Sequence, residues 1–339
     1  MKILVCGASG FVGRHFTTSL RAAGHTIVRG IRKPSQPDDI AVDYCQDTSK
    51  EAWLPKLAGI DVVINAVGVL RDSANQPMKL LLEQTPLALF SACKEADVKR
   101  IVQVSALGID QGIETPYFQY RRAPEAFLNE TFNPTVQQCS PESSRQAHYE
   151  HNKSDAVRPN PVEGHLLNDE KLNSIKFLIL RPSVIFGDDG ASAKLFRLLA
   201  GLPLHTLAAG GKQRLQPVHI DDICEAVNLW LADNSAPSQT VACVGQEATD
   251  MRGMLDSYRQ QLGHSQALHL SIPAKLVELS AKIGDFIPAS PLCSETLTML
   301  NAGNTGDAAE FTLLLGRPPR SYKTFIDKSR FDRFSGKTG

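Results

Sequence analysis

The sequence has no excess of charge of either sign, because its 36 acidic side chains balance its 36 basic ones. No broad electrostatic field therefore favours nucleic acid or an anionic membrane surface as a partner. No stretch approaches the roughly 18 consecutive apolar residues of a membrane-spanning helix, and the apolar run that begins at residue 3 is too short for the core of a signal peptide. These absences predict a soluble protein that binds no nucleic acid and has no integral membrane segment.

The seven cysteines are odd in number and include no C-x-x-C pair. This usage is typical of reduced thiols in a cytoplasmic protein. His148 and His151, with Cys139 and His165 nearby, fit no zinc-ligand spacing, so we predict no metal site. The chain also lacks a G-x-S-x-G motif, which argues against a serine hydrolase, and it has no repeat with a period of about 20–50 residues.

What the sequence does have is a glycine turn at its start, KILVCGASGFVG over residues 2–13. An apolar run leads into Gly7, Gly10 and Gly13, and helix-forming sequence follows. Such a turn aims the first N–H groups of the helix at one point, at the positive end of the helix dipole, which suits a pyrophosphate. Gly7 permits the tight turn, Gly10 lets the backbone approach the phosphates, and Gly13 lets helix and strand pack closely. We predict a dinucleotide site with contacts from Gly7, Ser9, Gly10, Phe11, Val12 and Gly13.

The residues after the second predicted strand, 25–31, indicate which dinucleotide binds. A fold that binds NAD usually places an Asp or Glu here to accept from the ribose 2′-OH. This chain has Arg32 and Lys33 instead. Two cations would pair with a 2′-phosphate, so NADP is the predicted cofactor and NAD the alternative. Asp43, at the end of a short predicted strand over 40–43, is placed to accept from the adenine amino group.

Apolar strands alternate with helical stretches along most of the chain, which predicts an α/β fold with a Rossmann-type, doubly wound parallel sheet. The strand over 61–67 ends in Ala66, Val67 and Gly68, small residues where the backbone must pass close to a cofactor. Further strands are predicted at 100–105, 177–180, 215–218 and 241–244. Asp221 or Asp222 is predicted to cap the helix that ends near residue 231, with His219 packing locally.

Three parts of the chain are predicted to have different roles. Residues 1–128 and 175–248 form the dinucleotide-binding core. Residues 129–174 form a polar, flexible insertion with a short helix near 162–172. Residues 249–339, with parts of 186–215, form a small, mainly helical cap with helices at 249–263, 273–283 and 295–302, over the carboxyl ends of the strands.

With the glycine turn, NAVG at 65–68, VSALG at 104–108 and LRPSVIFG at 180–187 in that order, the chain resembles the extended and atypical short-chain dehydrogenase/reductase superfamily. Within it, the chain is most similar to the NAD(P)-binding epimerase/dehydratase-like group, which includes NmrA-like regulators and complex I accessory subunits. The resemblance implies a Rossmann core with a small C-terminal substrate cap. It also implies that Pro182, Ser183 and Val184 contact the cofactor, beside the nicotinamide carboxamide.

In active members of this superfamily, a serine after the fifth strand and Tyr-x-x-x-Lys on the next helix carry catalysis. The tyrosine is the general acid/base, and the lysine lowers its pKa. The resemblance assigns these positions to Ser105 and Tyr117, but Arg121 stands where the lysine belongs. Arginine supplies charge yet cannot lose its proton. Pro124, in addition, is expected to break or restart this helix.

An intact Tyr-x-x-x-Lys occurs later, at Tyr149 and Lys153, and is the alternative catalytic pair. Two functions follow from the resemblance. The favoured one is an NADP-dependent oxidoreductase or epimerase/dehydratase that acts on a small carbonyl or hydroxyl compound. The alternative is a catalytically silent NAD(P)H-binding regulator or assembly factor, with 129–174 as its surface for a protein partner.

Overall fold

The computed structural model describes residues 1–73, 76–133, 175–287, 290 and 292–326. Its central sheet has seven parallel strands in the order β11-β6-β5-β4-β1-β2-β3. The strands are β1 (Lys2–Cys6), β2 (Thr26–Ile31), β3 (Asp39–Ala41), β4 (Val62–Asn65), β5 (Arg100–Val104), β6 (Lys176–Pro182) and β11 (Gln239–Cys243). The chain winds outward from β1 in one direction and then returns to β4 and winds in the other. The predicted doubly wound sheet is therefore confirmed, with its switch point between β1 and β4.

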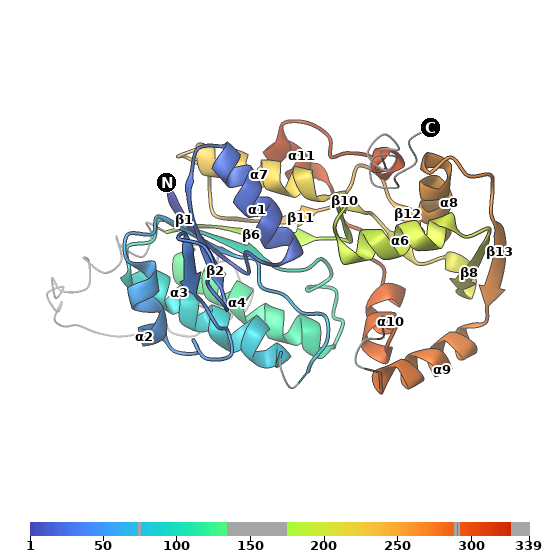
Figure 1. Cartoon of the computed structure of the whole chain (residues 1–339), viewed down its shortest axis with the longest axis horizontal. Helices are drawn as coiled ribbons and strands as arrows, with labels where there is room; N and C mark the ends of the chain where they lie inside the picture. The colour runs from blue at the N-terminus through green and yellow to red at the C-terminus, as the bar shows by residue number, and fades with distance from the viewer. Residues whose placement is uncertain (74–75, 134–174, 288–289, 291, 327–339) are drawn as a thin grey trace, which may run out of the picture.

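Helices cover both faces of this sheet (Figure 1). One face carries α1 (Phe11–Ala22), α7 (Ile220–Ala232) and α11 (Ala309–Leu315); the other carries α2 (Lys50–Trp53), α3 (Thr85–Glu95) and α4 (Pro116–Phe132). A 3₁₀ turn over Leu54–Leu57 follows α2, and a π-helical turn over Leu80–Gln84 precedes α3. In β1, Ile3 and Val5 face the first layer, while Leu4 and Cys6 face the second. Because successive strand residues point to opposite faces, this strand is apolar throughout.

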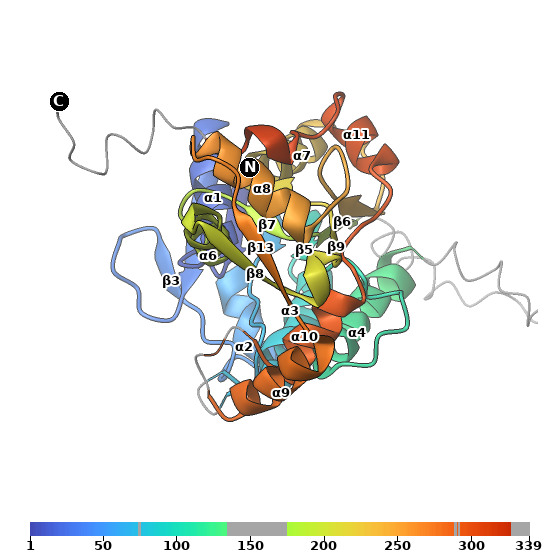
Figure 2. The same cartoon turned by 90° about the vertical axis from the view of Figure 1, so that its right-hand side faces the viewer.

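The cap lies at one end of the sheet, beyond the carboxyl ends of its strands (Figure 1). It is built from β7 (Ile185–Phe186), α6 (Ala191–Gly201), β8 (Leu204–Ala208), β9 (Arg214–Leu215), β10 (Val218–His219), β12 (Thr249–Asp250), α8 (Met251–Gln261), β13 (Leu268–Ile272), α9 (Ala274–Asp285) and α10 (Ser294–Asn301), with 3₁₀ turns at Ala209–Gly211 and Tyr322–Thr324. The Phe186 ring is its centre, 5.4 Å from the ring of Tyr258 and 5.0 Å from that of Phe325. Figure 2 shows β8 and β13 side by side.

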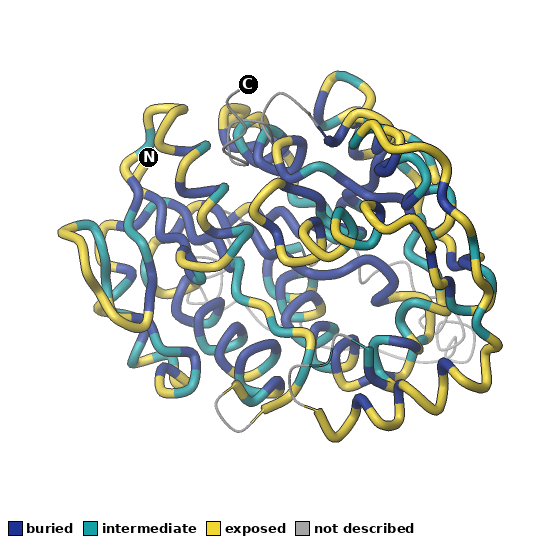
Figure 3. The backbone as a smooth tube through the Cα atoms, turned by 45° about the vertical axis from the view of Figure 1, so that its right-hand side comes forward, coloured by how far each residue is buried: buried dark blue, intermediate teal, exposed yellow. Residues whose placement is uncertain are grey.

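The cap differs from the prediction in three ways. It contains the parallel pair β8–β13, which the sequence analysis did not predict, and residues 249–250 pair with β9 before α8 begins. The stretch 309–315 lies in the core rather than in the cap, because Phe311 and Leu315 pack in the apolar layer beside α7. Figure 3 shows how much of α9 is exposed by comparison with the buried sheet.

Two local predictions are also corrected. Pro124 does not interrupt α4, which runs unbroken from Pro116 to Phe132. Pro124 is buried together with Arg121 and Glu125, and this packing offsets the one backbone hydrogen bond that proline cannot make. Helix α7 is capped by His219, whose Nδ1 accepts from the Asp221 N–H at 3.2 Å, and not by an aspartate.

The first residues of the predicted insertion, 129–132, belong to α4. The rest of the insertion from residue 134, with the predicted helix at 162–172 and the alternative pair Tyr149 and Lys153, lies outside the described residues. None of the helices in the described ranges has the length and apolar content needed to cross a membrane.

Candidate functional site

The glycine turn joins β1 to α1 with tight backbone contacts. Gly7 has a φ of +76°, and its carbonyl accepts from the Gly10 N–H at 2.9 Å. A Cβ on Gly13 would lie only 2.2 Å from the same carbonyl oxygen. Gly10 is the N-cap of α1, and no described side chain caps this helix or places an acid in its first turn. Its first N–H groups are therefore available to an anion, as a pyrophosphate site requires.

A cavity of about 760 Å³ opens beside this turn, at the switch point of the sheet. Its lining includes these residues of the predicted site: Gly7, Ser9, Gly10, Arg32, Lys33, Asp43, Ala66, Val67 and Gly68. Tyr44, Cys45, Val69, Gln76 and Leu81 also line it. Three stretches that are far apart in the sequence, after β1, after β2 and after β4, thus meet around one space large enough for a dinucleotide.

Phe11, Val12 and Gly13 lie outside this cavity lining, on the first turn of α1. The Phe11 ring packs against the loop after β7, where a Cβ on Gly187 would lie 2.8 Å from it. In the same loop, Asp189 accepts from Arg14 at 2.8 Å and lies 2.9 Å from the His15 Nε2. Although burial raises the pKa of Asp189, the hydrogen bonds to His15 and Arg14 lower it to about 2. This loop therefore holds the start of α1 in place beside the glycine turn.

A buried chain of hydrogen bonds runs beneath the NAVG loop. Asn65 is its centre: its Oδ1 accepts from the Tyr44 hydroxyl at 2.8 Å, and its Nδ2 donates to Gln103 Oε1 at 2.8 Å. The same Oδ1 accepts from the Val67 N–H at 3.2 Å, and Gln103 donates onward to the Val104 carbonyl at 3.1 Å. Three of these four bonds are buried and the Val67 bond is partly buried, so the chain fixes the backbone that lines the cavity.

Tyr117 and Arg121 lie together on α4, and Arg121 reaches the end of β5 at the residue before Ser105. Arg121 donates to the Val104 carbonyl, next to Ser105, at 3.0 Å, and its guanidinium lies 4.7 Å from the centre of the Tyr117 ring. All three residues are buried, and the Ser105 Oγ has no hydrogen-bond partner among the described residues. A Cβ on Gly68 would lie 2.9 Å from the Arg121 Nη2, so Arg121 adjoins the 760 Å³ cavity that Gly68 lines.

Pro182 ends β6, Ser183 and Val184 follow it, and none of the three lines the cavity. Their polar groups are engaged within the protein. The Ser183 hydroxyl donates to the Gln216 carbonyl at 2.6 Å, and the Val184 N–H donates to Asn304 Oδ1 at 2.7 Å. Ser183 and Val184 thus join the end of β6 to Gln216 and Asn304, which lie in segments that connect the cap to the core.

Two residues with a role at this site were not found from the sequence. Glu295, in the first turn of α10, accepts from the Tyr117 N–H at 3.1 Å, and burial raises its pKa. Arg71, just after the NAVG loop, donates to the Ser290 carbonyl at 2.9 Å and to the Ile287 carbonyl at 2.8 Å, beyond the end of α9. Both contacts bind the cap to the core beside Tyr117. No local pattern marks them, because 178 residues separate Glu295 from Tyr117.

A family model described as NAD(P)H-binding matches residues 7–138, which supports a nicotinamide cofactor. Curated relatives include an epimerase family protein of Staphylococcus epidermidis, 23% identical over 244 residues, which covers 69% of this chain and 72% of the relative. A chloroplast epimerase family protein of Arabidopsis thaliana is 24% identical over 300 residues, which covers 84% of this chain and 76% of the relative.

Solved structures share the fold over nearly the whole chain. MoeE5 in complex with UDP-glucuronic acid and NAD has a TM-score of 0.65 and 16% identity, covering 99% of this chain and 100% of MoeE5. A human epimerase family protein with NADPH has a TM-score of 0.64 and 18% identity, covering 96% of this chain and 97% of that protein. The glycine turn, the doubly wound sheet and these relatives support an extended short-chain dehydrogenase/reductase superfamily assignment, and the chain is similar to NAD(P)-binding, epimerase-like proteins.

Proposed function

We propose that this protein is an NADP(H)-dependent oxidoreductase or epimerase/dehydratase that acts on a small carbonyl or hydroxyl compound. One observation carries the proposal: Arg121 connects the Tyr117 ring, the Val104 carbonyl next to Ser105, and the Gly68 edge of the cofactor cavity. The Tyr117 ring and the fixed Arg121 cation therefore lie together beside this cavity, and Ser105 directly follows the residue whose carbonyl Arg121 holds. This grouping suits proton transfer to or from a substrate oxygen.

Each side chain has a role in this proposal. Ser105 hydrogen-bonds and polarises the substrate oxygen, because its buried Oγ has no other partner among the described residues. Tyr117 passes the proton. Arg121 supplies a permanent positive charge above the phenol ring and holds the end of β5 through Val104. The nicotinamide cofactor, when bound, supplies or accepts the hydride.

The preference for NADP rests on Arg32 and Lys33, which line the cavity after β2. Calorimetric titration with NADPH and with NADH tests it. We expect tighter binding of NADPH, and each tenfold preference corresponds to about 1.4 kcal/mol. The double variant Arg32→Ala, Lys33→Ala should lose at least about tenfold in NADPH affinity and keep its NADH affinity. Lys176→Ala, at the start of β6 and away from the cavity, is the matched control. Binding of neither nucleotide would refute the proposal.

Tyr117→Phe tests the catalytic part. The variant removes one hydroxyl but keeps the ring beneath Arg121, so NADPH affinity should stay within about twofold of the parent protein. Turnover should be abolished, measured as NADPH oxidation with a panel of small aldehydes and ketones. Turnover that survives in this variant would remove Tyr117 from the mechanism and leave the pair Tyr149 and Lys153 as the alternative.

The second candidate function is a binding protein that uses NAD(P)H without turnover. It is favoured by Arg121, which replaces the superfamily's lysine and already donates to Val104. A cofactor that co-purifies, with no activity over the carbonyl panel, would support it. Activity that appears only in Arg121→Lys would support it further. Loss of a captured protein partner on deletion of 134–174 would identify the surface that it uses. The cysteine usage supports the cytoplasm as the proposed location for either function.

A further inference from the structure

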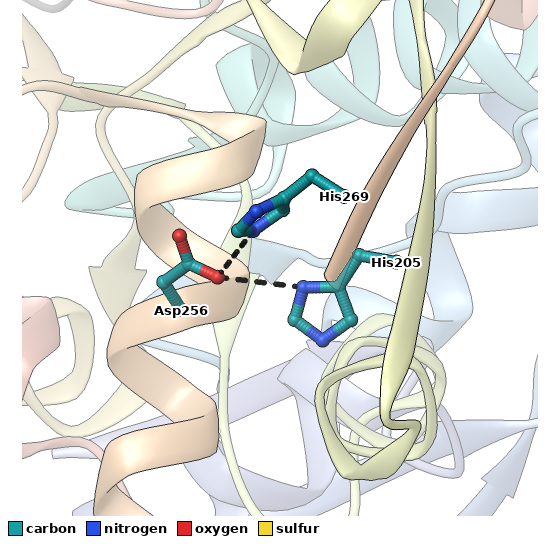
Figure 4. Close-up of side chains that lie close together, drawn as sticks. All are labelled: His205, Asp256 and His269. Carbon is teal, nitrogen blue, oxygen red and sulfur yellow. Dashed lines mark hydrogen bonds and ion pairs between the residues drawn. The ribbon is translucent and has the colours of Figure 1, made fainter. Parts of the chain in front are cut away.

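The cap brings together two histidines and an aspartate that the proposed mechanism does not use. His205 lies on β8, Asp256 on α8 and His269 on β13 (Figure 4). Strands β8 and β13 pair in parallel, and their register sets His205 directly opposite His269. Residues paired in this way project from the same face of a sheet. Helix α8 supplies Asp256, and one oxygen of its carboxylate faces both rings (Figure 4).

The donor atoms of these three side chains converge on one point. The Oδ1 of Asp256 lies 2.8 Å from the Nε2 of His269 and 3.5 Å from the Nδ1 of His205. One potential ligand atom from each residue lies within 4.8 Å of the others. In a tetrahedral zinc site with bonds of about 2.0–2.2 Å, ligand atoms are separated by about 3.3–3.6 Å. Small side-chain rotations would therefore let one ion contact all three.

His205 provides a second, independent observation. Its side chain has 0% exposure, and neither ring nitrogen has a hydrogen-bond partner among the described residues. A buried polar ring without partners destabilises the fold, so such a ring in a native protein calls for an explanation. Its Nδ1 faces Asp256 but at a distance longer than an ordinary hydrogen bond. A metal ion between them would satisfy that nitrogen.

The cluster is also accessible. Asp256 and His269 line a cavity of about 980 Å³, with Ser257 and His264 on its wall. An ion held by three protein ligands would have its remaining coordination position toward this space, where water can bind. Two neutral imidazoles and one carboxylate are ligands that suit zinc, whereas magnesium and calcium prefer oxygen alone.

We propose that His205, Asp256 and His269 bind one zinc ion in the cap. The ion joins α8 to the β8–β13 pair, from which the chain continues directly into α9. This zinc site is separate from the 760 Å³ cavity beside the glycine turn, because none of the three proposed ligands lines that cavity. The site therefore stands or falls independently of the proposed oxidoreductase function.

Zinc binding to the full-length protein tests the proposal. After dialysis against a chelator, the protein is titrated with zinc in competition with a chromophoric chelator, and bound zinc is measured by elemental analysis. We expect one equivalent per chain. His269→Gln and Asp256→Asn should each lose at least about tenfold in affinity, since even indirect partners of a metal cost about 10–100-fold.

Two controls separate this site from others. His264→Gln changes a histidine on the same cavity wall that is not in the cluster. The double variant His148→Gln, His151→Gln removes histidines that lie outside the described residues. Both should bind zinc as the parent protein does. Circular dichroism and thermal unfolding without metal check that each variant is folded, and Asp256→Asn, which preserves side-chain shape, guards against misfolding.

Cobalt provides a readout of the ligands themselves. Co²⁺ in the parent protein should give the visible absorption of a four- or five-coordinate ion with nitrogen and oxygen ligands, and this absorption should be lost in His269→Gln. No zinc binding by the parent protein would overturn the proposal, and the cluster would then be a hydrogen-bonded Asp–His pair. Equal affinity in all variants, or a loss confined to His148→Gln, His151→Gln, would also overturn it.

Discussion

Gly13→Ala tests the close approach of helix α1 to the Gly7 carbonyl, on which the glycine turn depends. Gly13 lies in the first turn of α1, and the carbonyl of Gly7 lies where its side chain would be. An added Cβ would stand 2.2 Å from the Gly7 oxygen, 2.7 Å from the Gly7 carbonyl carbon and 2.9 Å from the Ala8 Cα. All three are backbone atoms, so no side-chain rotation relieves the contact. Strand β1 and helix α1 must move apart.

The expected cost follows from two opposing effects. Overpacking costs about 1–3 kcal/mol when neighbours can shift, and a backbone contact this short belongs at or above the upper end. Alanine is favoured over glycine inside a helix by about 1 kcal/mol, which offsets part of the cost. We expect a net loss of about 2 kcal/mol in the free energy of unfolding. Movement of the Gly7 carbonyl also disturbs its hydrogen bond from Gly10, so NADPH affinity should fall.

Urea unfolding and NADPH titration of the same preparation provide the measurement. Gly201→Ala, at the end of α6, is the matched control, because a Cβ there would meet nothing within 4 Å. It should be neutral or slightly stabilising and should leave NADPH binding unchanged. If Gly13→Ala unfolds at the same urea concentration as the parent protein and binds NADPH equally well, then our account of the turn is wrong.

Two further predictions concern the core and its contact with the cap. Arg100 donates to the Trp230 carbonyl at 2.5 Å and to the Asp233 carbonyl at 2.7 Å. Arg100→Met removes both bonds and should lower the free energy of unfolding, measured in urea, by about 1.5–3 kcal/mol. An unchanged midpoint of the urea unfolding curve would contradict this prediction. Because burial raises the pKa of Glu295, the native state holds its proton more tightly than the unfolded chain does, and stability falls as pH rises through the folded-state pKa. Glu295→Gln keeps an acceptor for the Tyr117 N–H, so the variant should be more stable than the parent protein at pH 8. The gain should be less than about 1 kcal/mol because the side chain is only half-buried. Near pH 4 the variant should lose this advantage.

The sheet was predictable because its signals are local. The run Ile3–Cys6, the glycine turn and α1 are consecutive, and each apolar strand lies within one short window. The same holds for Tyr117 and Arg121, which lie four residues apart and therefore share one side of α4. The resemblance to the superfamily assigned this pair, and its four-residue spacing within one helix brings the two side chains together.

The cap was harder to predict because its contacts join distant segments. Strand β13 is mostly exposed, with Leu268 at 74% exposure, so it lacks the pattern of a buried strand. The pairing of His205 with His269 depends on a register between strands from separate parts of the chain. General helix preferences predicted that Pro124 would break α4 and that an aspartate would cap α7. In the structure Pro124 lies buried within a continuous helix, and His219 is the cap. Tertiary packing, which local sequence does not reveal, accounts for the buried proline.

The path of the chain between its two halves limits how this molecule can be altered. After β6, the segment 185–219 belongs to the cap, and α7 and β11 (220–243) return to the core. Residues 249–301 are again cap, α11 (309–315) packs in the core, and 322–326 ends in the cap beside Phe186. No single cut in the described chain therefore releases the cap as a separate piece, and a cap from a relative cannot be grafted on by one exchange of sequence. Any new specificity must arise by substitutions made in place, each of which the sheet has to tolerate.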